Sequence, residues 1–109
     1  MAGSYTTDIT HFLDEEGNLI SAPAQARRLA EHLTAIIVMA SFPDPELPPE
    51  YQAYCHRRPN RKPCKTGLLG FVLPDSDTIA WLCPRCGHNG LITGWRGTMW
   101  DMSAAEVAH

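Results

Sequence analysis

The spacing of four cysteines limits the fold of this chain more than any other feature. They are Cys55, Cys64, Cys83 and Cys86, so that eight residues separate the first two, 18 separate the pairs and two separate the last two. Four cysteines in a reducing compartment bind a metal more often than they form disulfides. The central gap has room for a strand, a tight turn and a returning strand, which would bring both pairs to one end of a hairpin. The sequence therefore predicts one closed, structural zinc site (Zn²⁺) with four thiolate ligands.

The two cysteine pairs differ in how well they match a zinc knuckle, the tight turn that presents two ligands. The stretch CPRCG, Cys83 to Gly87, matches it, because backbone N–H groups in such a turn face the sulfurs and the glycine relieves crowding. The first pair is wide for a knuckle. The sequence therefore leaves open whether His56 or His88 replaces Cys55, since imidazole also suits zinc. Iron is a second metal that suits four thiolates.

A closed site leaves no position for an activated water, so we expect no catalysis at the metal and no small-molecule substrate. A zinc deaminase requires His-x-Glu followed by Pro-Cys-x-x-Cys. Here the order is Cys83-Pro84, and no His-x-Glu occurs. The alternative is a thiol-redox protein or an enzyme that uses the Cys83/Cys86 pair, although such a pair usually lies in a βαβ context.

The first half of the chain predicts a β-hairpin followed by one long helix. Residues 9–21 contain Gly17-Asn18, which tolerate the positive φ of a tight turn. Ser21 is a plausible N-cap, and Pro23 falls near the first helical turn, where its missing N–H costs nothing. The residues that then recur at three- and four-residue spacing form one apolar stripe over about five turns. They are Ala26, Leu29, Ala30, Leu33, Ile36, Ile37 and Ala40.

Four prolines between Phe42 and Glu50 end this helix, because proline disrupts helices and favours an extended linker. Beyond the linker we expect short strands at residues 68–73, 78–83 and 90–95. The predicted fold class is therefore α+β. An N-terminal β-hairpin and one long amphipathic helix pack with a C-terminal three-stranded antiparallel zinc ribbon.

A chain of 109 residues is expected to form a single compact domain. Its parts are the hairpin plus helix at 1–41, a proline-rich linker at 42–50, the zinc ribbon at 51–102 and a tail at 103–109. No apolar run approaches the length of about 18 residues that spans a membrane. The N-terminus lacks the features of a signal peptide, so the expected location is the cytoplasm, where thiols stay reduced.

Several motifs resemble those of a known group of proteins. The segment from Cys64 to Trp95 looks like a zinc ribbon, a β-hairpin and third strand clasped by two cysteine-bearing turns. Five stretches together resemble small uncharacterised bacterial zinc-ribbon proteins over nearly the whole chain. They are DITHFLDEEGNL, PAQARRLAEHLTAII, CHRRPNRKPC, IAWLCPRCGHNGLITGW and GTMWD. The group has no assigned reaction, so the resemblance implies a fold and a bound metal more than a function.

Five cations lie within or beside the gap of the first cysteine pair, and we call this segment, residues 55–67, the basic loop. They are Arg57, Arg58, Arg61, Lys62 and Lys65. Three interpretations remain open: the cations offset thiolate charge, contact the phosphates of a nucleic acid, or dock a protein. A net charge of −3 disfavours non-specific nucleic-acid binding by the chain as a whole, but a local patch could still bind. The expected partner is therefore a protein or a nucleic acid.

Tryptophans and histidines are the remaining side chains with chemical interest. Trp81 alternates with Ile79, so we expect it to pack in the core. The sequence leaves open whether Trp95 and Trp100 pack on the helix or stay partly exposed. His32 has no partner visible in the sequence, so the default is a surface or core histidine.

Overall fold

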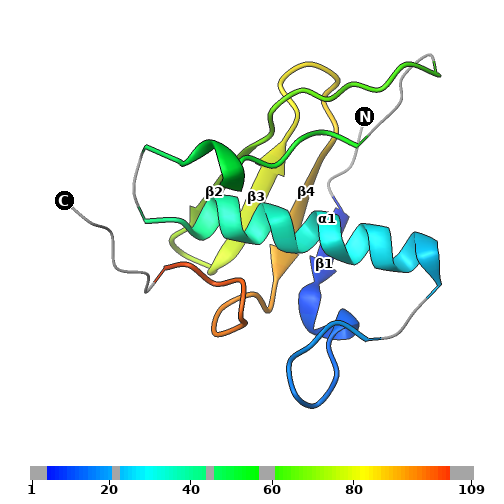
Figure 1. Ribbon diagram of the computed structural model, residues 1–109. Helices are drawn as coiled ribbons and strands as arrows, with labels where there is room; N and C mark the ends of the chain where they lie inside the picture. The colour runs from blue at the N-terminus through cyan, green and yellow to red at the C-terminus, as the bar shows by residue number, and fades with distance from the viewer. Residues whose placement is uncertain (1–4, 21–22, 44–45, 57–60, 104–109) are drawn as a thin grey trace.

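The computed structural model describes residues 5–20, 23–43, 46–56 and 61–103. One long helix lies across one face of a four-stranded sheet (Figure 1). The elements in chain order are β1 (Tyr5–Asp8), the 3₁₀ helix η1 (Ile9–Phe12), α1 (Ala24–Ser41), the 3₁₀ helix η2 (Pro49–Tyr51), β2 (Leu69–Leu73), β3 (Thr78–Leu82) and β4 (Asn89–Thr93). Among the described residues, no helix has the length and apolar character needed to cross a membrane.

The sheet has the strand order β1-β4-β3-β2. β2, β3 and β4 pair antiparallel, in the three positions where the sequence predicted strands. The predicted three-stranded antiparallel ribbon is nevertheless incomplete, because β1 adds a fourth strand that pairs parallel with β4. The sequence YTTD of β1 has no apolar alternation, and its partner lies more than 80 residues away, so no local pattern indicates the pairing. The sheet is therefore mixed.

The predicted N-terminal β-hairpin is reduced to a turn closed by an isolated bridge between Leu13 and Leu19. The Asp14 N–H donates to the Asn18 carbonyl at 2.8 Å, and Gly17 has the positive φ of 84° that the sequence predicted for this turn. Residues before the turn leave the hairpin pattern and form η1 and β1 instead.

The helix α1 has nearly the predicted extent and buries most of the predicted stripe. Its most buried members include Ala30, Leu33, Ile36 and Ile37, which face the sheet. Leu29 departs from the prediction, because 48 % of its surface is exposed. The predicted N-cap at residue 21 lies outside the described residues, and among the described ones Pro23 precedes the first helical residue.

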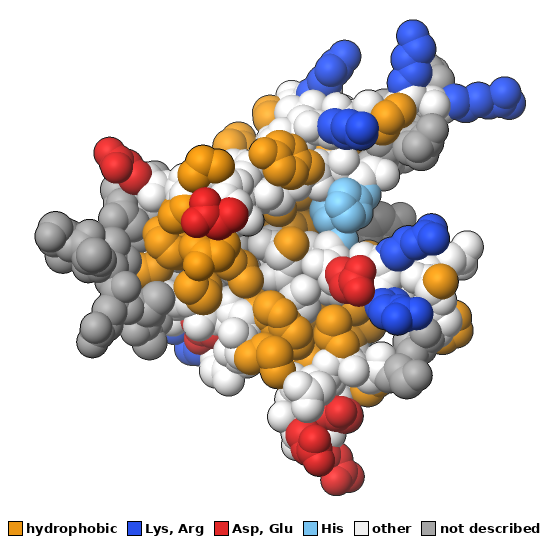
Figure 2. Space-filling model, in the orientation of Figure 1, with side chains coloured by type: hydrophobic (Ala, Val, Ile, Leu, Met, Phe, Trp, Pro, Cys, Tyr) orange, Lys and Arg blue, Asp and Glu red, His pale blue; other side chains and the backbone are white. Residues whose placement is uncertain are grey.

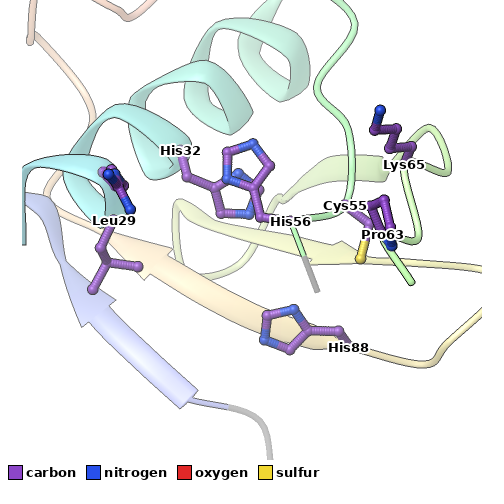
Figure 3. A pocket seen from close by; sticks show the side chains of 8 residues that line it. Leu29, His32, Cys55, His56, Pro63, Lys65 and His88 are labelled. Carbon is purple, nitrogen blue, oxygen red and sulfur yellow. The ribbon is translucent and has the colours of Figure 1, made fainter. Parts of the chain in front are cut away.

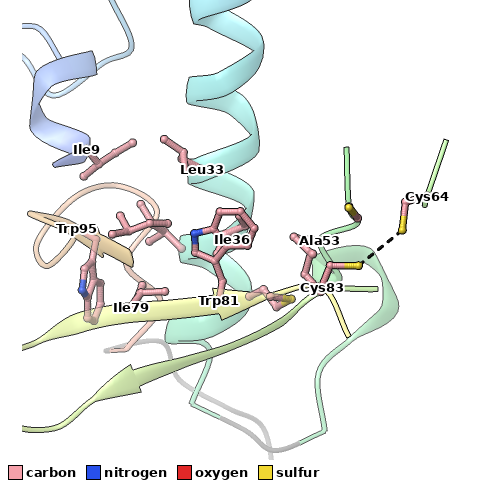
Figure 4. Packing of buried hydrophobic residues seen from close by; sticks show 14 residues of the cluster. Ile9, Leu33, Ile36, Ala53, Cys64, Ile79, Trp81, Cys83 and Trp95 are labelled. Carbon is pink, nitrogen blue, oxygen red and sulfur yellow. Dashed lines mark hydrogen bonds between the residues drawn. The ribbon is translucent and has the colours of Figure 1, made fainter. Parts of the chain in front are cut away.

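Side chains from α1 and from the inner face of the sheet form the core (Figure 4). Trp81 and Ile79 share this inner face, as predicted, and are buried. Trp95 is fully buried, and its indole N–H donates to the Asp77 carbonyl at 2.6 Å. Trp100 is partly buried against the same cluster. The two tryptophans whose environment the sequence left open therefore both pack on the core.

The close contact between Gly90 and Trp81 predicts that a side chain added at position 90 destabilises the protein. A Cβ added at Gly90 would lie 2.9 Å from three atoms of the Trp81 ring. We expect Gly90→Ala to lower the free energy of unfolding by about 1–3 kcal/mol, because a buried ring cannot give way as a flexible side chain can. Denaturant unfolding measures this change.

Gly70→Ala is the matched control for this prediction. Its added Cβ would meet the mobile end of Met39 at 3.0 Å, together with Ala40 Cβ at 3.1 Å. We expect a smaller loss, because the methionine end can shift. Equal losses in the two variants would contradict the packing described for Trp81.

Candidate metal centre

The structure brings the four cysteines together at one end of β3 and β4. The sulfur atoms of Cys55, Cys64, Cys83 and Cys86 all lie within 4.8 Å of one another. The Sγ–Sγ distances are 3.5 Å from Cys55 to Cys86 and 3.6 Å from Cys64 to Cys83. Figure 4 shows the second of these contacts as a dashed line. None of the four forms a disulfide, since both distances are far longer than a disulfide bond of about 2.05 Å.

The wide spacing of the first pair is accommodated by two antiparallel arms. The Cys55 N–H donates to the Thr66 carbonyl at 2.8 Å, and the Leu68 N–H donates to the Ala53 carbonyl at 2.9 Å. Thr66 and Leu68 thus tie the returning arm to the outgoing one on both sides of a bridge between Tyr54 and Gly67. The two cysteines are therefore placed by backbone pairing, so that they do not need to share one tight turn.

Gln52 anchors these arms to the helix. Its side-chain amide donates to the carbonyls of Ala53 at 2.8 Å and Leu68 at 3.0 Å. The same nitrogen lies 3.4 Å from the sulfur of Met39 on α1. One side chain therefore bonds to both arms and contacts the helix, which fixes where the first cysteine pair begins.

The second pair forms the predicted knuckle at the end of β3. The Cys83 N–H donates to the His88 carbonyl at 2.7 Å, and the Gly87 N–H donates to the Cys83 carbonyl at 3.0 Å. The Cys86 N–H points at the sulfur of Cys83, 3.4 Å away. Gly87, which follows the second cysteine of its pair, has φ 79°, and Lys65, in the same place after Cys64, has φ 52°. Both pairs therefore end in a left-handed residue that turns the chain sharply.

The surroundings of the cysteines favour thiolates, the form that binds metal. Burial raises the pKa of Cys83, but hydrogen bonds from the Cys86 and Arg85 N–H groups and with neighbouring thiols outweigh it, and the pKa falls to about 6. The hydroxyl and N–H of Thr66 lower the pKa of Cys64. Two of the four thiols thus have a lowered pKa even without a metal.

The cluster fits a tetrahedral metal ion. A zinc–sulfur distance of about 2.3 Å gives a tetrahedron with edges of about 3.8 Å, close to the two sulfur separations given above. Cys55 belongs to the cluster, so neither His56 nor His88 is needed in its place. Within the described ranges, the side chains that meet closely enough to hold an ion are these four cysteines. The chain can therefore supply all four ligands of one metal ion from thiols.

Three of the five cations of the basic loop are described, and all three are exposed. These are Arg61, Lys62 and Lys65. Arg57 and Arg58 lie outside the described residues. Lysine and arginine side chains project on both sides of a hollow at this end of the molecule, with a histidine between them (Figure 2). The basic loop therefore lies directly beside the cysteine cluster.

Three histidines gather next to the cysteines, and sequence reasoning missed them as a group. The rings of His32 on α1 and His56 stack with centroids 4.0 Å apart and planes 27° apart. Trp81 contacts His32 edge-on at 5.8 Å and His88 at 5.0 Å. His56 follows Cys55 directly and His88 comes two residues after Cys86. Both rings are therefore placed at the site once the cysteines come together. No local signal in the sequence brings His32 to the same place.

His32 has a strongly lowered pKa. Burial lowers its pKa, with smaller contributions from His56 and His88, to about 4 from a usual value of 6.5. Its exposed fraction is 6 %, and its Nε2 has no hydrogen-bond partner among the described residues. The ring therefore stays neutral at pH 7 and has an unused polar atom.

No family model, curated protein or solved structure matches this chain. The interpretation of the site therefore depends on the chemistry and geometry of its own residues.

Removal of one ligand tests the cysteine cluster. We expect Cys86→Ser to lose bound metal and several kcal/mol of unfolding free energy, because metal affinity at such a site is folding free energy. Metal analysis and thermal unfolding measure both effects. Arg85→Ser is the matched control, because this exposed side chain lies between the two ligands and its backbone is unchanged. Equal metal content and equal melting in the two variants would exclude a metal centre here.

The lowered pKa of His32 predicts a pH effect. Folded His32 protonates near pH 4, whereas the unfolded chain protonates near 6.5, so the unfolded state binds more protons between these values. Stability therefore falls as the pH falls through this window, by at most about 3 kcal/mol from this residue. An NMR titration of the His32 ring in the metal-loaded protein should give a midpoint near 4, and urea-unfolded protein is the control. A midpoint near 6.5 in the folded protein would show that the ring is not buried as described.

Proposed function

We propose that the chain is a small structural zinc protein of the zinc-ribbon type that acts as an interaction module. The observation that carries this proposal is the convergence of four thiols within 4.8 Å from two segments of the chain. The resemblance of the motifs around the cysteines to zinc-ribbon proteins supports zinc as the metal. The partner is a protein or a nucleic acid that meets the basic loop.

The donor set favours a structural role for the metal. Structural zinc sites are closed by four protein ligands, whereas catalytic sites keep one position for water. Cys55, Cys64 and Cys83 are buried, and Cys86 is half-buried, so the chain encloses the ion on most sides. A bound zinc ion would cross-link the two cysteine pairs. We therefore propose that the protein is not an enzyme.

Charge supports the basic loop as the contact surface. Four thiolates around one zinc ion carry a formal charge of −2, which nearby cations partly offset. Arg61 and Lys62 are nevertheless exposed, so a partner can reach them. Because Cys64 lies between Lys62 and Lys65 in the sequence, a bound ion would hold the backbone beside these cations. A pre-ordered cationic segment binds an anionic partner with less loss of conformational entropy.

A thiol-redox protein that uses Cys83 and Cys86 is the second candidate. Its supporting observation is the lowered pKa of Cys83, which favours the reactive thiolate. Two observations weigh against it. Sγ–Sγ contacts of 3.5 Å and 3.6 Å join Cys86 to Cys55 and Cys83 to Cys64, so each thiol of the pair also contacts a thiol outside it. Cys83 is also fully buried, out of reach of a redox partner.

Metal content and thiol reactivity separate these two candidates. The interaction module predicts one zinc ion per chain and four thiols that do not react until a chelator is added. A metal-free protein with a Cys83–Cys86 disulfide that cycles under mild reductant would support the redox protein and exclude the module.

Salt dependence tests the basic loop as a binding surface. We expect an anionic polymer such as a random single strand to bind, with an affinity that falls steeply with salt. The triple variant Arg57→Ala, Arg58→Ala and Arg61→Ala should flatten this dependence. Each lost phosphate contact lowers the slope of log affinity against log salt concentration by a little under one unit. Arg27→Ala on α1 is the control. An unchanged slope in the triple variant would exclude this loop.

A further inference from the structure

The three histidines line a pocket of about 500 Å³ between α1 and the cysteine-bearing loops (Figure 3). Arg28 and His32 come from the helix, Lys65 and His56 from the basic loop, and His88 from the knuckle. Figure 3 shows the imidazole rings reaching the same space from these separate segments. In Figure 2 the pocket opens as a hollow with cations on both sides. A volume of this size is within the range of small-molecule sites.

The pocket offers a planar surface for stacking. His56 is exposed, and His32 covers one of its two faces at a centroid distance of 4.0 Å. Because His56 is exposed, a second ring can reach it from solvent. Histidine, like the larger aromatic residues, stacks well on nucleic-acid bases. Trp81 backs the assembly by edge contacts to His32 and His88, so the stack rests on the core.

The wall of the pocket includes a residue with a buried polar atom that has no partner. His32 is more than nine-tenths buried, and its Nε2 has no hydrogen-bond partner among the described residues. Such an atom costs free energy, which a bond to a ligand would recover if binding moves the ring and uncovers the atom.

Charge specifies the other part of the ligand. Arg28 and Lys65 line the pocket from two different segments, so two cations attract an anionic group that enters it. The adjoining smaller pocket, of about 300 Å³, shares Arg28, His32 and His56 and includes the acidic Glu31. The main pocket therefore suits an anionic group. Because Glu31 repels such a group, the favoured position for it is near Lys65.

A metal ion is a poorer fit to the three rings. A metal ion lies in the plane of each imidazole that binds it. The rings of His32 and His56 are stacked and nearly parallel, so their nitrogen lone pairs lie in separate planes and do not meet at one ion. An acidic peptide would use the cations but not the open ring face. A nucleotide would use both the ring face and the cations.

We propose that this pocket binds a nucleotide unit, with its base stacked on His56 and its phosphate on the Lys65 side of the pocket. The inference rests on the proposed function, because the metal ion fixes the loops that carry His56, Lys65 and His88. It narrows the partner from any anionic macromolecule to one with nucleotide chemistry. A free nucleotide and one residue of a single strand present the same groups.

Binding to the zinc-loaded full chain tests the inference. The probes are a labelled six-nucleotide single strand of random sequence, followed by fluorescence anisotropy, and AMP, followed by calorimetry. We expect His56→Ala to weaken strand binding at least about fivefold, because stacking contributes about 1 kcal/mol or more per base. We expect Arg28→Ala and Lys65→Ala to weaken binding and reduce its salt dependence.

Matched variants separate the pocket from general charge and folding effects. His11→Ala removes an exposed histidine on η1, and Arg27→Ala removes the exposed cation next to Arg28. Neither should change the affinity. A second readout that does not depend on mutation is the NMR spectrum, in which AMP or the strand should shift the ring signals of His32 and His56.

The outcomes distinguish a free nucleotide from a single strand as the ligand, and the nucleotide proposal from the zinc proposal. AMP binding with the same residue dependence supports a nucleotide site, and strand binding alone supports the same site on a longer ligand. Zinc-loaded protein that binds neither probe, or that loses affinity equally in His56→Ala and His11→Ala, overturns the inference and leaves the zinc proposal standing. Binding of poly-glutamate with the same residue dependence, without nucleotide binding, also overturns it. Failure to load zinc contradicts the proposed function itself.

Discussion

Four thiols meet at the end of the sheet where β3 ends and β4 begins. The arms around Cys55 and Cys64 are otherwise held by a short stretch of backbone pairing, by the Gln52 side chain and by packing on the core. Two of the thiols have a lowered pKa, so without a cation at their centre the cluster would bring negative charges together in a buried place. A bound metal turns this unfavourable arrangement into a cross-link, and in a small protein such a cross-link contributes much of the stability.

The groups with chemical interest lie beside this cysteine cluster. His56 and Lys65 flank ligands in the basic loop, and His88 follows the knuckle. The sheet contributes Trp81, which contacts two of the histidines edge-on. The helix contributes the third ring, His32, and its packing on the sheet holds that ring against His56. A metal centre without catalytic chemistry can in this way build a binding pocket beside itself.

The sequence predicted the parts of the fold that depend on local patterns. The helix α1 and strands β2, β3 and β4 follow from apolar periodicity and turn residues. β1 could not be predicted, because a short threonine-rich strand gains its place only through a parallel partner distant in the chain. The four cysteines were predicted as a site by their number and spacing, although the wide first pair needed backbone pairing that the sequence does not display. The histidine pocket was missed, because His32 approaches the other rings only through the packing of α1 on the sheet.

The most direct test of the metal centre is X-ray absorption at the zinc edge of protein purified without added metal. The account predicts one zinc ion per chain with a shell of four sulfur atoms at about 2.3 Å and no nitrogen. A shell that contains nitrogen at about 2.0–2.1 Å would show that a histidine replaces a cysteine. Protein that folds with the same stability and without any metal would contradict the central claim.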